Sequence, residues 1–171
     1  GKEVLLVRTD PVGLTGYELV ISASDVEGLW NMLNEVGSNM GIVPLGEATF
    51  EVLRVEAGEP RYGQELGEVY NPLEAGIQDD ISWDKGCYIG QEVIARLRTY
   101  HKVKRYLVTL SLEQVEGVQQ GDTLMVDDKL VGVLTTLVVP PDGLGGMALA
   151  YLRTAHVRLG TRVEVVIDGG G

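Results

Sequence analysis

The 171-residue sequence contains one cysteine, Cys87, and only two histidines, His101 and His156. One cysteine cannot form a disulfide bond within the chain, so we expect a reducing compartment, the cytoplasm by default. One thiol and two imidazoles are also too few for a zinc site, which takes about four ligands. The sequence therefore predicts no metal site built by this chain alone.

Long apolar runs are lacking as well. No stretch approaches the roughly 20 apolar residues of a membrane-spanning helix, and no signal-peptide pattern opens the sequence. We therefore expect a globular protein without a membrane partner. The first residue is Gly rather than Met, so we expect that the natural start has been removed and that an N-terminal part is missing.

Positive charge is scarce, because 14 Lys and Arg face 25 Asp and Glu and leave a net charge of −11. Such a chain is not expected to wrap nucleic acid, whose phosphates require cations. Basic residues nevertheless gather in one stretch: Arg96, Arg98, Lys102, Lys104 and Arg105. This cluster predicts either a solvated helix end or a local binding site for a carboxylate, a phosphate or RNA.

The first half of the sequence has the pattern of a mixed α+β unit. Residues 3–9 and 17–22 are apolar and β-branched around a turn at 10–16, and they predict a hairpin. Apolar residues at helical spacing predict a helix over 26–36 that ends at Gly37, and Gly58 closes a second helix over 47–57. Residues 59–83 are expected to form an ordered loop, followed by a short amphipathic helix over 91–100.

After residue 103 the apolar period changes to two. Five short apolar segments separated by turns predict a small antiparallel β-barrel without a long helix. We therefore place a first domain at residues 1–101 and the barrel domain at 102–168.

Cys87 has unusual neighbours for a structural cysteine. It lies between Gly86 and Tyr88, two residues after Lys85. If a helix begins near Gly90, the helix N-terminus and the ammonium group both favour the thiolate. The pattern predicts a reactive thiol at Cys87 assisted by Lys85, and the alternative is an inert buried cysteine in a loop.

Three stretches resemble known families. "KGCYIGQE" (85–92) resembles the signature of the YgfZ family, folate-binding proteins connected with iron–sulfur enzymes. "LRVEAGEPRYGQEL" (53–66) and "NPLEAG" (71–76) resemble the glycine-cleavage T protein, an aminomethyltransferase that uses tetrahydrofolate. The resemblance covers nearly the whole chain, and it corresponds to only the second half of such a protein.

The resemblance implies a three-lobed fold with tetrahydrofolate, or a derivative of it, in a central channel. Gly16-Tyr17-Glu18-Leu19 matches the family's turn before a Glu, so Glu18 is expected to accept hydrogen bonds from the pterin. Arg54, Tyr62 and Tyr88 are further expected folate contacts. Two of these residues have an alternative, since Glu18 could simply face solvent on a strand and Arg54 could be a structural ion-pair partner.

The sequence departs from the T-protein pattern at two positions. Pro11 stands where the T protein has a Tyr, and Phe50 stands where it has an Arg. The T protein's catalytic Asp is expected in the N-terminal half. The resemblance therefore implies first a YgfZ-type protein that binds tetrahydrofolate and supports the assembly or repair of iron–sulfur enzymes, including tRNA-modifying ones.

Iron–sulfur proteins are then the expected partners, since Cys87 supplies one ligand where a cluster usually takes about four. The alternatives are an aminomethyltransferase that transfers a one-carbon unit to tetrahydrofolate, and an RNA-binding module.

Overall fold

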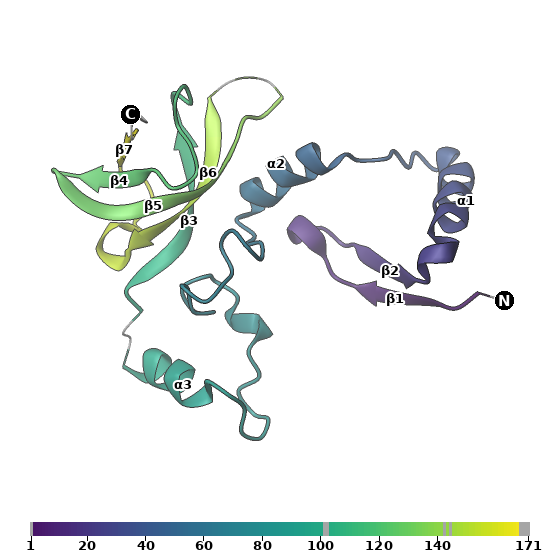
Figure 1. Cartoon of the computed structure of the whole chain (residues 1–171), viewed down its shortest axis with the longest axis horizontal. Coiled ribbons are helices and arrows are strands. Elements are labelled where there is room, and N and C mark those ends of the chain that lie inside the picture. Colours follow the sequence, from purple (N-terminus) through teal and green to yellow (C-terminus); the bar gives the residue numbers. More distant parts are fainter. Residues whose placement is uncertain (1, 101–102, 142, 144, 168–171) are drawn as a thin grey trace.

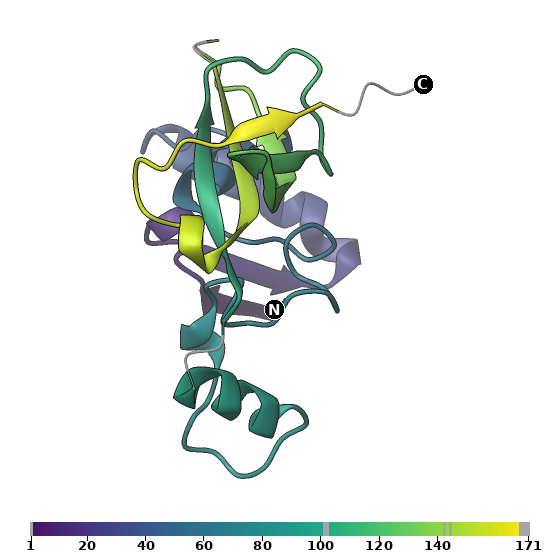
Figure 2. The same ribbon diagram turned by 90° about the vertical axis from the view of Figure 1, so that its left-hand side faces the viewer.

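A computed structural model describes residues 2–100, 103–141, 143 and 145–167. Its elements form two β-sheets joined by helices and a long loop, which confirms the mixed helix and sheet class. Figure 1 shows the N-terminal sheet and the C-terminal sheet at opposite ends of the long axis, with α2 between them. In both Figure 1 and Figure 2, α3 projects away from the two sheets.

The N-terminal sheet is the predicted hairpin. β1 (Val4–Arg8) pairs antiparallel with β2 (Tyr17–Ile21), and the register places Val7 opposite Glu18. The connection contains a single 3-10 turn, η1 (Pro11–Gly13). The backbone is left-handed at Asp10 (φ 46°) and Val12 (φ 52°), and a β-branched residue such as Val12 rarely adopts this conformation.

Three helices follow, close to the predicted positions. The 3-10 turn η2 (Ala23–Asp25) leads into α1 (Val26–Ser38), which continues one residue beyond Gly37. α2 (Glu47–Ala57) ends at Gly58, whose φ of 75° is typical of a glycine after a helix. Residues 59–90 are loop with one short turn, η3 (Gln78–Asp80), and α3 is Gln91–Thr99.

The C-terminal sheet contains the five predicted strands: β3 (Arg105–Leu112), β4 (Thr123–Val126), β5 (Lys129–Val138), β6 (Gly146–Arg153) and β7 (Glu164–Val166). All neighbours are antiparallel, in the order β3-β6-β5-β4-β7. Its core contains Leu124, Val131, Ala150 and Leu152, against which β3 and β7 both pack. Because the two outermost strands contact one core, the sheet curves into a barrel-like unit. The 3-10 turn η4 (Thr154–His156) is its only helical segment within the described residues.

The predicted domain boundary falls at residues 101 and 102, which lie outside the described residues, as do His101, Lys102 and residue 168. Within the described part of the chain, no helix is long and apolar enough to cross a membrane.

Candidate functional site

Glu18 lies on β2, on the exposed N-terminal hairpin. In the described part of the chain its carboxylate makes no hydrogen bond or ion pair with another residue. The neighbouring turn is fixed by Asp10, which accepts hydrogen bonds from Arg8 Nε at 2.8 Å and from the Gly16 amide at 3.4 Å. Glu18 is thus a free acceptor next to an ordered turn, and its two oxygens suit the paired N–H groups of a pterin edge.

The tip of this hairpin lies against α2. The two elements carry Pro11 and Phe50, the two residues that depart from the T-protein pattern. A hollow of about 600 Å³ lies along α2, and Phe50, Glu51, Arg54 and Arg61 are among its lining residues. The structure therefore brings both departures to one region, beside a cavity with charges of both signs.

Arg54 is one of the most buried residues, with 3% of its surface exposed. Its Nε and Nη2 donate to Glu51, its Nη1 donates to the Glu59 carbonyl and to Glu65 at 3.1 Å, and its Nη2 also donates to Gln64 at 3.0 Å. A guanidinium has five N–H groups, and these contacts engage all three nitrogens. The structure therefore favours the ion-pair role of Arg54 over the expected folate contact.

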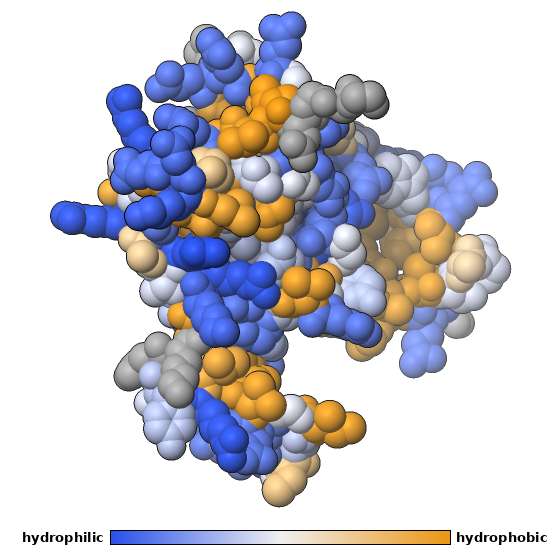
Figure 3. Space-filling model, turned by 60° about the vertical axis from the view of Figure 1, so that its left-hand side comes forward, coloured by the Kyte–Doolittle hydropathy of each residue, from blue (hydrophilic) through white to orange (hydrophobic). Residues whose placement is uncertain are grey.

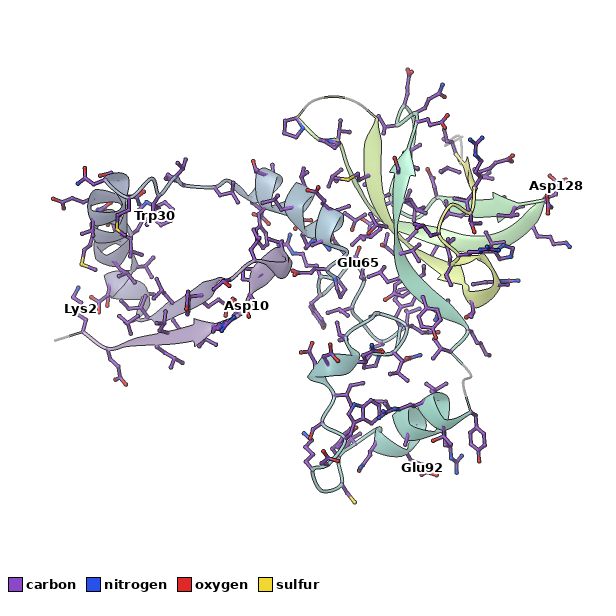
Figure 4. The ribbon with its side chains drawn as sticks, turned by 180° about the vertical axis from the view of Figure 1, so that it is seen from behind. Lys2, Asp10, Trp30, Glu65, Glu92 and Asp128 are labelled. Carbon is purple, nitrogen blue, oxygen red and sulfur yellow. The ribbon has the colours of Figure 1, made fainter. Side chains whose placement is uncertain are left out.

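Glu65 is the centre of this network, and no sequence pattern singled it out as a site residue. Its side chain is fully buried. One carboxylate oxygen accepts from Thr136 Oγ1 at 2.5 Å, and the other accepts from Arg54 and from the Arg61 amide at 3.0 Å. The Glu65 carbonyl accepts from the Tyr151 hydroxyl at 2.9 Å. Figure 4 shows Glu65 between α2 and the five-stranded sheet. Through Thr136 and Tyr151, Glu65 connects the loop after α2 to β5 and β6.

We call the contacts of Arg54 and Glu65 with the five-stranded sheet the junction, and an aromatic stack extends it. The rings of Tyr70 and Tyr151 are parallel with centroids 3.6 Å apart, and the Arg105 guanidinium lies 4.4 Å from the Tyr70 centroid. Arg105 also donates to Glu74 at 3.2 Å. Burial raises the pKa values of both phenols. The phenols therefore remain neutral packing groups, and no sequence pattern indicated that they would meet.

Cys87 lies in the loop before α3, and its exposure agrees with the expected accessible thiol. Lys85 Nζ lies 5.0 Å from the centroid of the half-buried Tyr88 ring, so two predicted site residues are neighbours. Figure 4 places Glu92, on α3 directly after this loop, well away from the N-terminal hairpin, which carries Asp10. The structure therefore separates the loop of Cys87, Lys85 and Tyr88 from Glu18.

Tyr62 is 85% exposed, on the loop that follows α2. It is available to a ligand, and in the described residues it makes no side-chain hydrogen bond.

The basic cluster is partly neutralised within the protein. Arg96 pairs with Glu92 at 2.5 Å, Arg98 lies 4.2 Å from the Trp83 ring centroid, and Arg105 is held by Glu74. These contacts engage three of the five basic side chains, and Lys102 lies outside the described residues. Among the described residues, no group of three or more His, Cys, Asp or Glu could hold a metal ion.

Comparison with known families shows which superfamily the chain belongs to. Residues 1–85 match the family model described as the GCVT N-terminal domain, and residues 105–171 match the glycine cleavage T-protein C-terminal barrel domain. The chain belongs to the glycine-cleavage T-protein superfamily. Both matches follow the order of elements in the structure, with the five-stranded sheet inside the barrel-domain match.

Relatives within the T-protein superfamily are similar over nearly all of this chain. An aminomethyltransferase of Symbiobacterium thermophilum is 36% identical over 167 residues, which are 97% of this chain and 44% of the relative. An Arabidopsis thaliana protein, named as a candidate chloroplastic transferase, is 36% identical over 156 residues, 91% of this chain and 35% of the relative. The chain thus spans less than half the length of these curated relatives.

A solved T-protein structure has the same fold. The crystal structure of glycine cleavage system aminomethyltransferase T from Bartonella henselae superimposes with a TM-score of 0.78 at 21% identity, over 99% of this chain and 47% of that chain. Superfamily membership makes tetrahydrofolate the cofactor to test against the site. Glu18 and Tyr62 are exposed and accessible to such a ligand, whereas the Arg54 guanidinium is already engaged by Glu51, Gln64 and Glu65.

Proposed function

We propose that this chain forms the C-terminal part of a tetrahydrofolate-binding protein of the aminomethyltransferase type. The observation that carries the proposal is the match of both T-protein domains, together with relatives named aminomethyltransferase. These relatives support aminomethyl transfer better than the YgfZ-type function that the sequence motif favoured.

In this proposal Glu18 orients the ligand. Its carboxylate accepts hydrogen bonds from two N–H groups of the pterin edge, and the turn from Asp10 to Gly16 fixes the strand that carries Glu18. Bound tetrahydrofolate supplies the acceptor for a one-carbon unit. The proposed transfer belongs to a protein that combines this chain with the remaining length of its relatives.

Titration calorimetry with tetrahydrofolate tests the role of Glu18. In the protein that combines both parts, Glu18→Gln should weaken binding by roughly 1.5–3 kcal/mol, the range for a hydrogen bond to a charged group. Glu3→Gln changes an exposed carboxylate next to β1 and should leave the dissociation constant unchanged. Equal affinities for the wild type and Glu18→Gln would return Glu18 to a solvent-facing role.

A YgfZ-type function is the second candidate, and one observation favours it. The motif "KGCYIGQE" places an exposed thiol at Cys87 in the loop before α3, and Figure 1 shows α3 well away from β2, the strand that carries Glu18. In this proposal Cys87, with Lys85 beside it, engages an iron–sulfur protein while folate binds elsewhere.

Cys87→Ser separates the two candidates, and Ile89→Ser is a control for disturbance of the same loop. Under the second candidate, Cys87→Ser abolishes support of iron–sulfur enzyme activity and leaves tetrahydrofolate affinity intact, whereas Ile89→Ser affects neither. Under the first candidate, aminomethyl transfer and folate affinity both survive Cys87→Ser.

A further inference from the structure

Two arginines lie side by side on the C-terminal sheet. Arg105 on β3 and Arg153 on β6 are directly opposite each other in the antiparallel register. Side chains at opposite positions share one face of a sheet with their Cβ atoms about 4.5–5.5 Å apart, and like charges there are destabilising. The register therefore creates a local excess of positive charge on a chain whose net charge is −11.

The two guanidinium groups are neutralised to different extents. Arg105 Nε donates to Glu74 at 3.2 Å and its Nη2 donates to the Val69 carbonyl at 2.7 Å, while its Nη1 makes no hydrogen bond within the described residues. Arg153 is exposed, and its guanidinium has no hydrogen bond, ion pair or ring contact with any described residue. One carboxylate thus faces two cations, so a positive charge remains for an external anion.

A pocket of about 220 Å³ lies beside this pair. Both arginines line it, together with Tyr151 and apolar residues of β5 such as Leu130 and Val133. In the described part of the chain, no Asp or Glu is among its lining residues. Figure 3 shows apolar patches among hydrophilic side chains on this nearer, upper part of the molecule. The pocket is smaller than the roughly 300–1,000 Å³ of pockets for drug-sized ligands, so it suits a small molecule.

The pocket belongs entirely to the C-terminal sheet. All its lining residues lie on β3, β5 and β6, and this sheet has a core of its own. Figure 1 shows the sheet and the hairpin that carries Glu18 at opposite ends of the molecule. The pocket is therefore separate from the proposed folate contact at Glu18.

We propose that Arg105 and Arg153 bind the carboxylate of a small organic acid, whose apolar part lies against Leu130 and Val133. Guanidinium groups bind carboxylates through charge-assisted N–H···O bonds, and an anion between the two arginines offsets their mutual repulsion. The apolar lining favours an organic acid over inorganic phosphate, because phosphate has no apolar part to bury. This inference goes beyond the proposed function and holds whether or not the protein binds tetrahydrofolate.

The test uses benzoate as the probe and benzamide as a matched ligand of similar shape without the charge. In NMR titrations of the protein that combines this chain with the remaining length of its relatives, benzoate should shift the backbone amides of Gly132, Val133 and Arg153. Benzamide should bind at least 10-fold more weakly. Binding of inorganic phosphate as tight as that of benzoate would show that the apolar lining plays no part, and the proposed ligand class would be wrong.

A pair of variants locates the contact. Arg153→Gln should weaken benzoate binding at least 10-fold, whereas Arg162→Gln, at an exposed position before β7, should not change it. The Tm without ligand should not fall in Arg153→Gln, because this exposed guanidinium has no partner among the described residues. Saturating benzoate should raise the Tm of the wild type and of Arg162→Gln, but not that of Arg153→Gln.

Two results would overturn the proposal. The first is an equal benzoate affinity in the wild type and Arg153→Gln, which would place the ligand elsewhere. The second is a loss of tetrahydrofolate affinity in Arg153→Gln, which would make the pocket part of the folate site rather than a site of its own.

Discussion

In β6 the residues from Ala148 to Leu152 are all buried, whereas every residue of the equally apolar β1 is exposed. Both strands lie in antiparallel sheets, so the pairing does not explain the contrast. The difference is that the five-stranded sheet closes around a core, which β3 and β7 both contact, whereas the two-stranded sheet has two free edges. An apolar pattern thus specifies a strand, and the remaining fold decides whether that strand is buried.

The hairpin turn lies against α2, and the Arg54–Glu65 network joins α2 to the C-terminal sheet, so we expect the largest effect there. Glu65→Ala removes one partner of a buried ion pair, which typically costs about 3–5 kcal/mol because the other charge remains buried. Urea denaturation followed by circular dichroism measures the loss in free energy of unfolding. Glu68→Gln, at an exposed position on the same loop, is the control and should stay within about 0.5 kcal/mol. A loss below about 1 kcal/mol for Glu65→Ala would show that the network does not join the regions.

A matched pair of leucines tests the contrast between the two sheets directly. Leu134 is 1% exposed in the C-terminal core, and Leu5 is 59% exposed on β1. Leu134→Ala should lower the free energy of unfolding by about 2–5 kcal/mol, the range for a buried leucine. Leu5→Ala should change it by no more than about 0.5 kcal/mol in the chain alone. Similar losses in the two variants would contradict the contrast.

The sequence predicted the local elements well because their signals are local. Alternation of apolar residues indicated the five C-terminal strands, and Gly58 marked the end of α2 at Ala57. The end of α1 was misplaced by one residue, since Gly37 remains inside the helix, where its lack of a side chain makes room for Ile42.

The site was harder to predict because its contacts are distant in sequence. Glu65 meets Thr136 and Tyr151 across 71 and 86 positions, and no spacing rule links them. For Arg54 the sequence left both a folate contact and a structural ion pair open, and the burial and five partner residues that bear on this choice include residues as distant in sequence as Thr136. A reactive thiol at Cys87 was expected from its place before a helix N-terminus and near Lys85, and its exposure agrees with this, but the separation of its loop from Glu18 was not predictable.

Acid should weaken the contact between Glu51 and Arg54, with the smallest of the three effects. Hydrogen bonding to Arg54 holds the pKa of Glu51 below its ordinary value of 4.5. A carboxyl group with a lowered folded-state pKa stabilises the fold above its unfolded pKa, and this contribution is lost as the pH falls through the folded value. The free energy of unfolding should therefore fall below about pH 4.5 more steeply in the wild type than in Glu51→Gln. Urea denaturation at pH 7, 5, 4 and 3 checks this, with the surface variant Glu113→Gln expected to follow the wild type. Parallel curves for the wild type and Glu51→Gln would mean that the contact with Arg54 contributes nothing to the pH dependence of the junction.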